Sequence, residues 1–496
     1  MRKTNLFIKY LKSINILINN LLEKNLNKLK AENILKFARS NKIFFTFVAV
    51  IVLFLFYLLI PTLYNQSDIS KKLKTELLIK LNLDFRFAKK LNYNIFPRPH
   101  FKSQEVIIQN KQNKTSKIKN LKVYVSLENL FLLKNLKINK VILENANFNL
   151  DKKNYNFFLN LLDNDFKDGN LEIKNSNIFF RDNKNEILFI NKIIDMKYYY
   201  DHNDKKKLIL ANNTIFNLPY ELKLNKDSIN KKIFSKVNLN IFKFQIENEF
   251  DYLNDIKLGK ADIILKKSKS KIYYKKNNQL FEFKYFDKQD NPNYFYKGSF
   301  NINPFYSNLV GNTKEFNLSN LINSNALSVL ILKTEILNNK NIDFELKIYA
   351  DKIYNNFNFQ NIILKSKIKE GLIDVDNTTF KWKNFIDFEL TNSLIFVKNN
   401  ELVLDGKLQI NINKHNEIYK YLLTPKKYRK YLKKIELNFS YNFDQKSTLL
   451  NDIKIDEKYN QNINKIMQNV ILKENKLQNK IYLKNLLNEA IKAYAG

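Results

Sequence analysis

The run IDFELKIYA at residues 342–350 shows the pattern that decides the fold of this chain. Apolar side chains occupy every second position, and Asp343, Glu345, Lys347 and Tyr349 stand between them. Such alternation gives a strand one dry face and one wet face, because successive side chains point to opposite sides. The run therefore predicts a half-buried antiparallel strand.

The same alternation recurs at residues 121–127, 380–390, 402–412 and 435–443. Several runs span about ten residues, or roughly 30 Å at the usual rise. The recurrence predicts a mainly β fold built on one long antiparallel sheet. Apolar positions of these runs, which the resemblance described below makes candidates for lining a groove, are Ile342, Phe344, Leu346, Ile348, Phe380, Trp382, Ile386, Phe388, Leu402, Leu404, Leu408, Ile410 and Ile412.

The alternation slips by one residue at two places. Val141 and Leu143 are followed by Ala146 and Phe148, and a similar slip occurs at residues 241–242. A strand keeps one face inward across such a slip only through a bulge, which bends the sheet. We therefore expect bulges at both places and a curved sheet.

An uncharged apolar run, IFFTFVAVIVLFLFYLLI, occupies residues 43–60. A helix of about 20 apolar residues crosses a bilayer core about 30 Å thick. Core helices of soluble proteins are usually shorter, and a cleaved signal peptide would end in a small-residue cleavage site. The run predicts one permanent transmembrane helix at residues 43–63.

Charge around this run predicts its orientation. Five Lys or Arg residues lie in residues 28–42 and three in residues 61–75. By the positive-inside rule the N-terminus is cytoplasmic and the long remainder lies across the membrane. The chain has no cysteine, which is compatible with an oxidising compartment and excludes disulfides, thiolate metal sites and cysteine nucleophiles.

The chain divides into four parts. Residues 1–42 read as a cytoplasmic basic amphipathic helical segment, residues 64–455 as the β-rich domain and residues 456–496 as a C-terminal helical segment. Directly after the membrane span, Ser67 can cap a short helix that ends near Asn82. Its apolar positions repeat every four residues at Ile69, Leu73, Leu77 and Leu81.

The formal net charge of +36 comes from Lys spread along the whole chain, beside many Asn and Ile residues. This composition is typical of an AT-rich genome, although it also favours contact with anionic headgroups. Hydrophobic residues make up 45% of the chain, so a disordered tail is excluded. Only seven Gly and seven Pro residues exclude glycine-rich phosphate loops and proline-rich linkers.

The sequence shows no catalytic or metal-binding motif. His100, His202 and His415 are far apart, so we expect no metal site, no cofactor and no enzymatic activity. Asp374 and Asp376 are interpreted as a solvated edge. The basic aromatic run at residues 426–434 could stack on nucleic acid, but a solvated helix face is the favoured interpretation.

Several segments after the span follow one another in a recognisable order. Pro97 and Pro99 form a P-x-P motif, and short strand-like segments follow at 105–108, 123–131 and 138–150, with a further strand opening at 169–178. Over residues 67–180 this order resembles the AsmA-like family of Gram-negative envelope proteins. The chain departs from that family in its longer N-terminal head and in Asn82, which stands where a glycine is common.

The resemblance implies a single-pass protein of the bacterial inner membrane with its bulk in the periplasm. It also implies a β groove, related to chorein-like lipid-transfer proteins, whose apolar interior holds acyl chains. We therefore expect a non-enzymatic protein that binds or transfers phospholipids and supports outer-membrane biogenesis, with other envelope proteins as partners and no nucleic acid. The alternatives are an envelope scaffold of the same topology without lipid, and a binder of anionic polymers or nucleic acid.

Overall fold

A computed structural model describes residues 42–495 with short gaps, which are 110–114, 129, 152–153, 165, 183, 228, 253–255, 266–267, 278–279, 287–293, 303–304, 318–326, 335–338, 340, 355, 370–371, 469–471 and 474–478. The basic helix predicted at the N-terminus therefore lies outside the described residues, except for Lys42.

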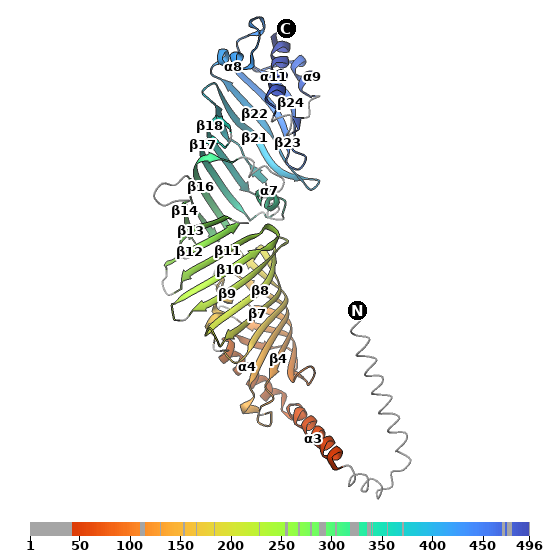
Figure 1. The fold of residues 1–496 in the computed structure, drawn as a ribbon. Coiled ribbons are helices and arrows are strands. Elements are labelled where there is room, and N and C mark those ends of the chain that lie inside the picture. Colours follow the sequence, from red (N-terminus) through yellow and green to blue (C-terminus); the bar gives the residue numbers. More distant parts are fainter. Residues whose placement is uncertain are drawn as a thin grey trace, which may run out of the picture.

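The apolar run forms helix α3 (Lys42–Leu59), which continues into the 3₁₀ turn η1 (Ile60–Leu63). In the described part of the chain it is the one helix long and apolar enough to cross a membrane. Figure 1 shows it projecting from one end of an elongated β body. Its C-terminal end is tied to that body, because the Tyr93 hydroxyl donates to the Leu58 carbonyl at 2.8 Å.

Helix α4 (Gln66–Leu81) follows, with Ile69, Leu73, Leu77 and Leu81 buried as the spacing predicts. The expected cap was wrong, because Asn65 and not Ser67 caps the helix by accepting from the Ser67 amide at 3.2 Å. Asn82 ends the helix in the left-handed region with φ 55°. Asparagine tolerates this conformation better than other non-glycine residues, so Asn82 can end the helix where a glycine is common.

All described strands belong to one sheet. Each strand pairs with its sequence neighbours, with three exceptions: β1 and β2 both pair with β3, β19 and β20 both join β18 to β21, and β25 and β26 both pair with β24. The first half holds β1 Asp84–Phe87, β2 Asn92–Asn94, β3 His100–Gln109, β4 Thr115–Val125, β5 Ile138–Leu150, β6 Asn170–Arg181, β7 Ile187–Asp201, β8 Lys206–Ile215, β9 Leu218–Asp227, β10 Lys232–Leu239, β11 Phe244–Asp251, β12 Ile256–Leu265 and β13 Ser268–Asn277. The second half holds β14 Leu280–Phe286, β15 Tyr294–Ile302, β16 Phe305–Phe316, β17 Asp343–Ile353, β18 Asn356–Lys369, β19 Leu372–Asp374, β20 Thr379–Trp382, β21 Ile386–Lys398, β22 Glu401–Ile412, β23 Lys434–Asn442, β24 Ser447–Ile455, β25 Lys458–Tyr459 and β26 Leu472–Lys473.

The sheet is antiparallel at all but two junctions, where β5 pairs with β6 and β16 with β17 in parallel. A parallel neighbour requires the chain to cross a face of the sheet between the two strands. The first connection, residues 151–169, contains α5 (Phe157–Asn160) and η3 (Leu161–Asp163). The second connection, residues 317–342, contains α7 (Leu327–Leu332).

Directly paired residues share a face, so the register assigns the two faces of the sheet. One face carries Tyr198, Ile209 and Leu224 in β7, β8 and β9, and we call it the dry face; the opposite one is the wet face. The predicted slip of phase near Leu143 is present, because Asn145 has φ 55° and both Leu143 and Ala146 are buried, but the predicted bulge was wrong: β5 keeps one register with β4 and with β6 on both sides of Asn145. The other predicted bulge was wrong: η4 (Asn240–Phe242) reverses the chain there between β10 and β11.

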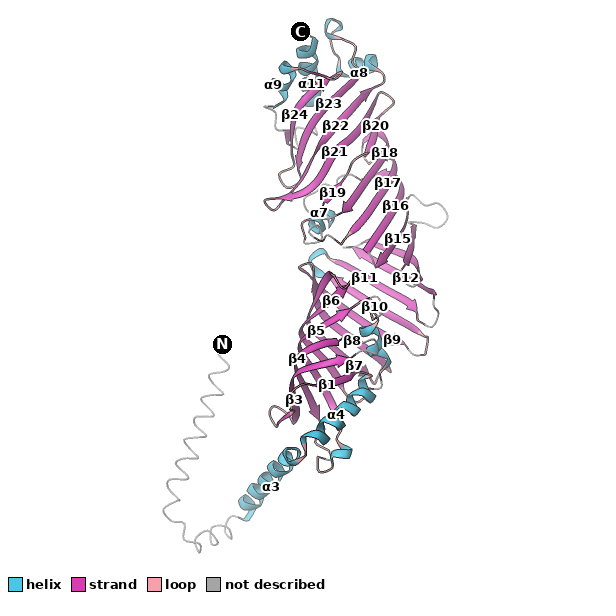
Figure 2. Ribbon diagram, turned by 180° about the vertical axis from the view of Figure 1, so that it is seen from behind, coloured by secondary structure: helices cyan, strands magenta, loops and turns pink. Residues whose placement is uncertain are grey.

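The helices and connections of the β body lie on the dry face. Near α3, helix α4 packs on it (Figure 2). Helix α4 and the first connection share one buried cluster that contains Leu73, Leu162 and Phe166. At the far end α9 (Gln461–Gln468) and α11 (Lys480–Ala495) bury Ile463 and Leu486 against β22 to β24, as predicted for a helical C-terminus. The remaining short elements are η2 Leu133–Asn135, α8 His415–Leu422 and η6 Lys426–Tyr428.

The sheet is bent toward its dry face. The Asn339 side-chain amide donates to the Leu188 carbonyl at 3.0 Å, which joins the end of the second connection, just before β17, to the start of β7. Those strands are ten steps apart, or about 48 Å in a flat sheet. Because Val329 of the same connection packs against Leu402 on the dry face, the bend closes on that side.

Candidate functional site

The register brings the predicted groove residues of the strands to one face. Phe380 pairs with Phe388, which pairs with Ile410, and Ile386 pairs with Ile412. On the other side of β18, Ile348 pairs with Leu364, and Phe380 packs against the cluster that contains both. Ile342 precedes β17 and stands outside the regular strand.

Several of these residues are covered by the chain itself. Leu402 is fully buried beneath Val329 of α7. Trp382 is 9% exposed and packs against Ile418 and Leu422 of α8, so it is a core residue and does not line an open groove. Leu408, Ile410 and Ile412 line the clusters formed with the C-terminal helices, and Ile348 is buried, whereas Phe344, Leu346, Ile386, Phe388 and Leu404 are half-buried.

The open part of the dry face lies between these covered ends, on β10 to β16. Its aromatic side chains are half-buried except for Tyr274, and residues of α5 and η3 border Tyr274 and Phe281 at one cavity. Phe281 stacks on Tyr274 at 4.5 Å between ring centroids and on Phe300 at 4.4 Å. We call this set the aromatic floor; its members are Tyr274, Phe281, Phe283, Tyr285, Tyr296 and Phe300.

Glycines let rings of the aromatic floor lie flat against the backbone. Gly259 is paired with Tyr274, and a Cβ at Gly259 would stand 2.1 Å from the Tyr274 ring. Gly298 is likewise paired with Phe283, where a Cβ would stand 2.6 Å from the ring. Aromatic rings that cover strand glycines are a known means of holding register, and here they also produce a smooth apolar surface.

The wet face of the same strands carries charged pairs. Lys236 and Glu247 are 3.1 Å apart across β10 and β11, and Lys269 and Asp262 are 2.9 Å apart across β12 and β13. These pairs are partly exposed to water, so each contributes little to stability. They do show that the two faces differ in chemistry, with ion pairs on one and aromatic rings on the other.

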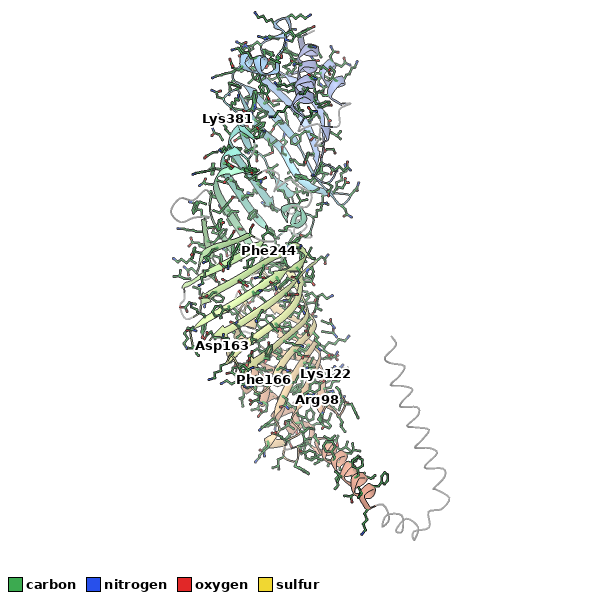
Figure 3. All side chains as sticks on the ribbon, viewed as in Figure 1. Arg98, Lys122, Asp163, Phe166, Phe244 and Lys381 are labelled. Atoms are coloured by element: carbon green, nitrogen blue, oxygen red, sulfur yellow. The ribbon has the colours of Figure 1, made fainter. Side chains whose placement is uncertain are left out.

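One cavity of about 300 Å³ opens on the dry face beside the first connection. Its walls combine Phe250 and Phe281 with Lys226, Lys257 and Lys276. Figure 3 places Asp163 of the first connection along the same part of the sheet. This volume is at the lower end of the range of about 300–1,000 Å³ usual for ligand pockets.

The other residues that the sequence analysis singled out make contacts within the fold. His100 stacks on Tyr124 with ring centroids 4.9 Å apart, and no group of three potential metal ligands occurs within the described residues. Asp376 accepts a hydrogen bond from the Ser393 amide at 2.6 Å, so it belongs to a strand junction and not to a free edge. Pro97 and Pro99 lie in the connection between β2 and β3, where the Pro99 carbonyl accepts from the Val125 amide at 3.1 Å.

The basic run at residues 426–434 is not the helix face that its pattern predicted. It forms η6 and an irregular segment before β23, with Lys427 over the Tyr428 ring at 4.9 Å. Within the run, Leu432 is buried in the cluster of the C-terminal helices. The segment therefore belongs partly to the core of that end.

Comparison with known proteins leaves the family open: no protein-family model matches the chain, and no curated protein matches it.

Sequence reasoning missed the aromatic floor and the cavity. The signal was present, because Lys226, Lys257 and Lys276 occupy positions in phase with the apolar residues of their strands. A charge at an apolar-phase position breaks the pattern of a structural sheet, so such positions indicate a site. The strong Lys bias of the chain hid that signal.

Proposed function

We propose that this chain is a non-enzymatic membrane-anchored protein that binds or transfers phospholipid acyl chains on its dry face. The observation that carries the proposal is the aromatic floor, a wide apolar surface that the chain covers at both ends but not in the middle. Covering apolar surface is favourable by about 0.8 kcal/mol per buried CH₂ group. Acyl chains contain many CH₂ groups and could cover this surface.

The anchor supports a place for this activity at a membrane. Apolar side chains surround the end of α3 that meets the β body: Leu63 is 84% exposed, Phe96 86% and Phe131 66%. Their exposure fits contact with the bilayer surface. We propose the bacterial inner membrane, a cytoplasmic N-terminus, a periplasmic β body and a role in outer-membrane biogenesis, which are the properties that the AsmA-like resemblance implies.

Lipid analysis of the full-length protein tests the proposal. The protein is purified in mild detergent and bound lipid is measured by native mass spectrometry. Phe283→Asp on the aromatic floor should lower bound phospholipid, because it places a charge where acyl chains would lie. Tyr273→Asp is the matched control, since Tyr273 is 46% exposed on the wet face of the adjacent strand.

A folded wild-type protein without acyl lipid would refute the proposal and favour the envelope scaffold. Equal loss of lipid in both variants would also count against the aromatic floor as the site. Orientation is tested separately by reporters fused after Ala495. A reporter active only in the cytoplasm would contradict the periplasmic placement.

A further inference from the structure

Three lysines stand on the dry face, where the surrounding strands carry apolar or aromatic side chains. Lys226 lies in β9, Lys257 in β12 and Lys276 in β13. Lys257 and Lys276 are direct cross-strand partners. Like charges placed opposite each other destabilise a sheet, so this pair has a cost that the fold alone does not explain.

The neighbourhood neutralises little of this charge. Asp163 contacts Lys226 and is the one carboxylate among the described residues that line the cavity. Three lysines and one aspartate leave a formal charge of +2 at the cavity wall. The Lys276 ammonium has no ion pair or hydrogen bond within the described part of the chain.

Two of the lysines contact Tyr252. The Lys226 ammonium lies 4.1 Å from the Tyr252 ring centroid, and Lys257 donates to the Tyr252 carbonyl at 3.2 Å. The Lys226 side chain is only 11% exposed. Burial lowers the pKa of both Lys226 and Lys276; the charges of Lys231 and Lys257 add to the effect on Lys226, and the charge of Lys257 adds to that on Lys276.

The cavity joins this charge to the aromatic floor. Phe281 and Tyr274 belong to both, so an anion held by the lysines stands at the end of an apolar surface. Lysine binds phosphate as a point charge, and several ammonium groups can share the oxygens of one phosphate. The arrangement matches an amphiphile with an anionic head and apolar tails.

We propose that Lys226, Lys257 and Lys276 form a headgroup site that selects phospholipids of net negative charge, whose acyl chains lie on the aromatic floor. This inference rests on the proposed function and adds the class of lipid. A zwitterionic headgroup presents its own cation to the lysines and is therefore bound less well.

The test uses the full-length protein in detergent and an equimolar mixture of phosphatidylglycerol and phosphatidylcholine. The protein is re-isolated and both bound lipids are quantified by mass spectrometry. We expect a preference of about tenfold for phosphatidylglycerol, which corresponds to about 1.4 kcal/mol. The triple variant Lys226→Gln, Lys257→Gln, Lys276→Gln should bind the two lipids nearly equally.

The matched control removes the same number of charges from the wet face of β9 and β13, as Lys223→Gln, Lys271→Gln, Lys275→Gln. It should keep the preference, as should the triple Lys→Arg variant of the site. Because all variants keep α3, lipid bound around the anchor contributes equally to each. Soluble glycerol 3-phosphate, added in excess, should compete poorly, since it lacks the acyl chains.

The outcomes separate the two proposals. Absence of acyl lipid from the wild type overturns the proposed function. Lipid bound without preference, or a preference that the site and control variants lose equally, overturns the headgroup site and leaves the lipid-binding function standing. Strong competition by glycerol 3-phosphate overturns the link to the aromatic floor and assigns the lysines to free phosphate esters.

Discussion

Replacing Gly259 by alanine tests the geometry of the aromatic floor at its most crowded point. The new Cβ would stand 2.1 Å from the Tyr274 ring and 2.3 Å from its hydroxyl oxygen, so the ring must move. That movement breaks the hydrogen bond from Tyr274 to Asn248, 2.5 Å long, and disturbs the stack on Phe281.

The expected cost follows from these contacts. Overpacking costs about 1–3 kcal/mol, and a lost hydrogen bond adds about 1 kcal/mol. Alanine is favoured over glycine in a strand by about 0.5–1 kcal/mol, which offsets part of this. We therefore expect Gly259→Ala to destabilise β12 and β13 by about 1–3 kcal/mol.

A double-mutant cycle makes the test specific to the ring. When Tyr274→Ala has removed the ring, Gly259→Ala should be neutral or slightly stabilising. The coupling energy should then be about 2–3 kcal/mol, well above the error of about 0.3–0.5 kcal/mol seen for independent sites.

Hydrogen exchange of the full-length protein measures the effect locally, through peptides that cover residues 256–277. Protection should fall in Gly259→Ala and should not fall further when the change is made in the Tyr274→Ala background. A coupling energy near zero would refute the register of β12 and β13 and with it the flat aromatic surface on which the lipid proposal depends.

Three further predictions concern other parts of the molecule. Leu73→Ala should lower the free energy of unfolding by about 2–5 kcal/mol, whereas Leu78→Ala, 45% exposed on the same helix, should change it by less than about 0.5 kcal/mol in denaturant titrations. Two lysine partners lower the pKa of Glu436 from 4.5 to about 2, so its stabilising effect is complete above pH 4.5 and is lost as the pH falls toward 2. Glu436→Gln should therefore be less stable than wild type at neutral pH and flatten the acid side of the stability curve; an unchanged curve would contradict the pairing. Phe131→Trp should give fluorescence that brominated lipids quench in proteoliposomes, while Tyr354→Trp, placed on the β body, should not be quenched.

The sequence predicts the strands well where alternation is strong. Residues 402–412 and 435–443 correspond closely to β22 and β23, and Asn399 and Asn400 form the turn before β22 with positive φ angles of 51° and 63°. The alternation persists because one face of each strand is dry along its whole length.

Chain reversals are harder to predict in this composition. The run 380–390 reads as one strand, but a turn at Lys383, with φ 51°, divides it into β20 and β21. The apolar phase continues through the turn because Trp382 and Ile386 are direct partners and share a face. Lysine and asparagine occupy most left-handed positions here, and both are common everywhere in the chain, so they give no turn signal.

The periodicity of apolar residues does not predict which strands pair or whether they pair in parallel. Alternation at residues 343–350 predicts that β17 has a dry face, but nothing in it indicates a parallel neighbour in β16. The connections between strands also determine which parts of the dry face are covered. Leu402, for example, is buried because α7 packs over it. The sequence therefore predicts which face of the sheet carries the candidate site, but it does not predict which strands of that face remain uncovered.

The covered ends change what lipid binding by this chain would mean. Apolar surface next to the anchor is already filled by α4 and the first connection, with Leu77 and Leu162 fully buried. The C-terminal helices fill the opposite end in the same way. The open surface from β10 to β16 extends over six strand spacings, or roughly 29 Å at the usual strand spacing. A bounded surface of that width suits a protein that holds lipid molecules and passes them to a partner. A continuous conduit would need both ends uncovered, so displacement of α4 or of the C-terminal helices would have to precede any flow along the sheet.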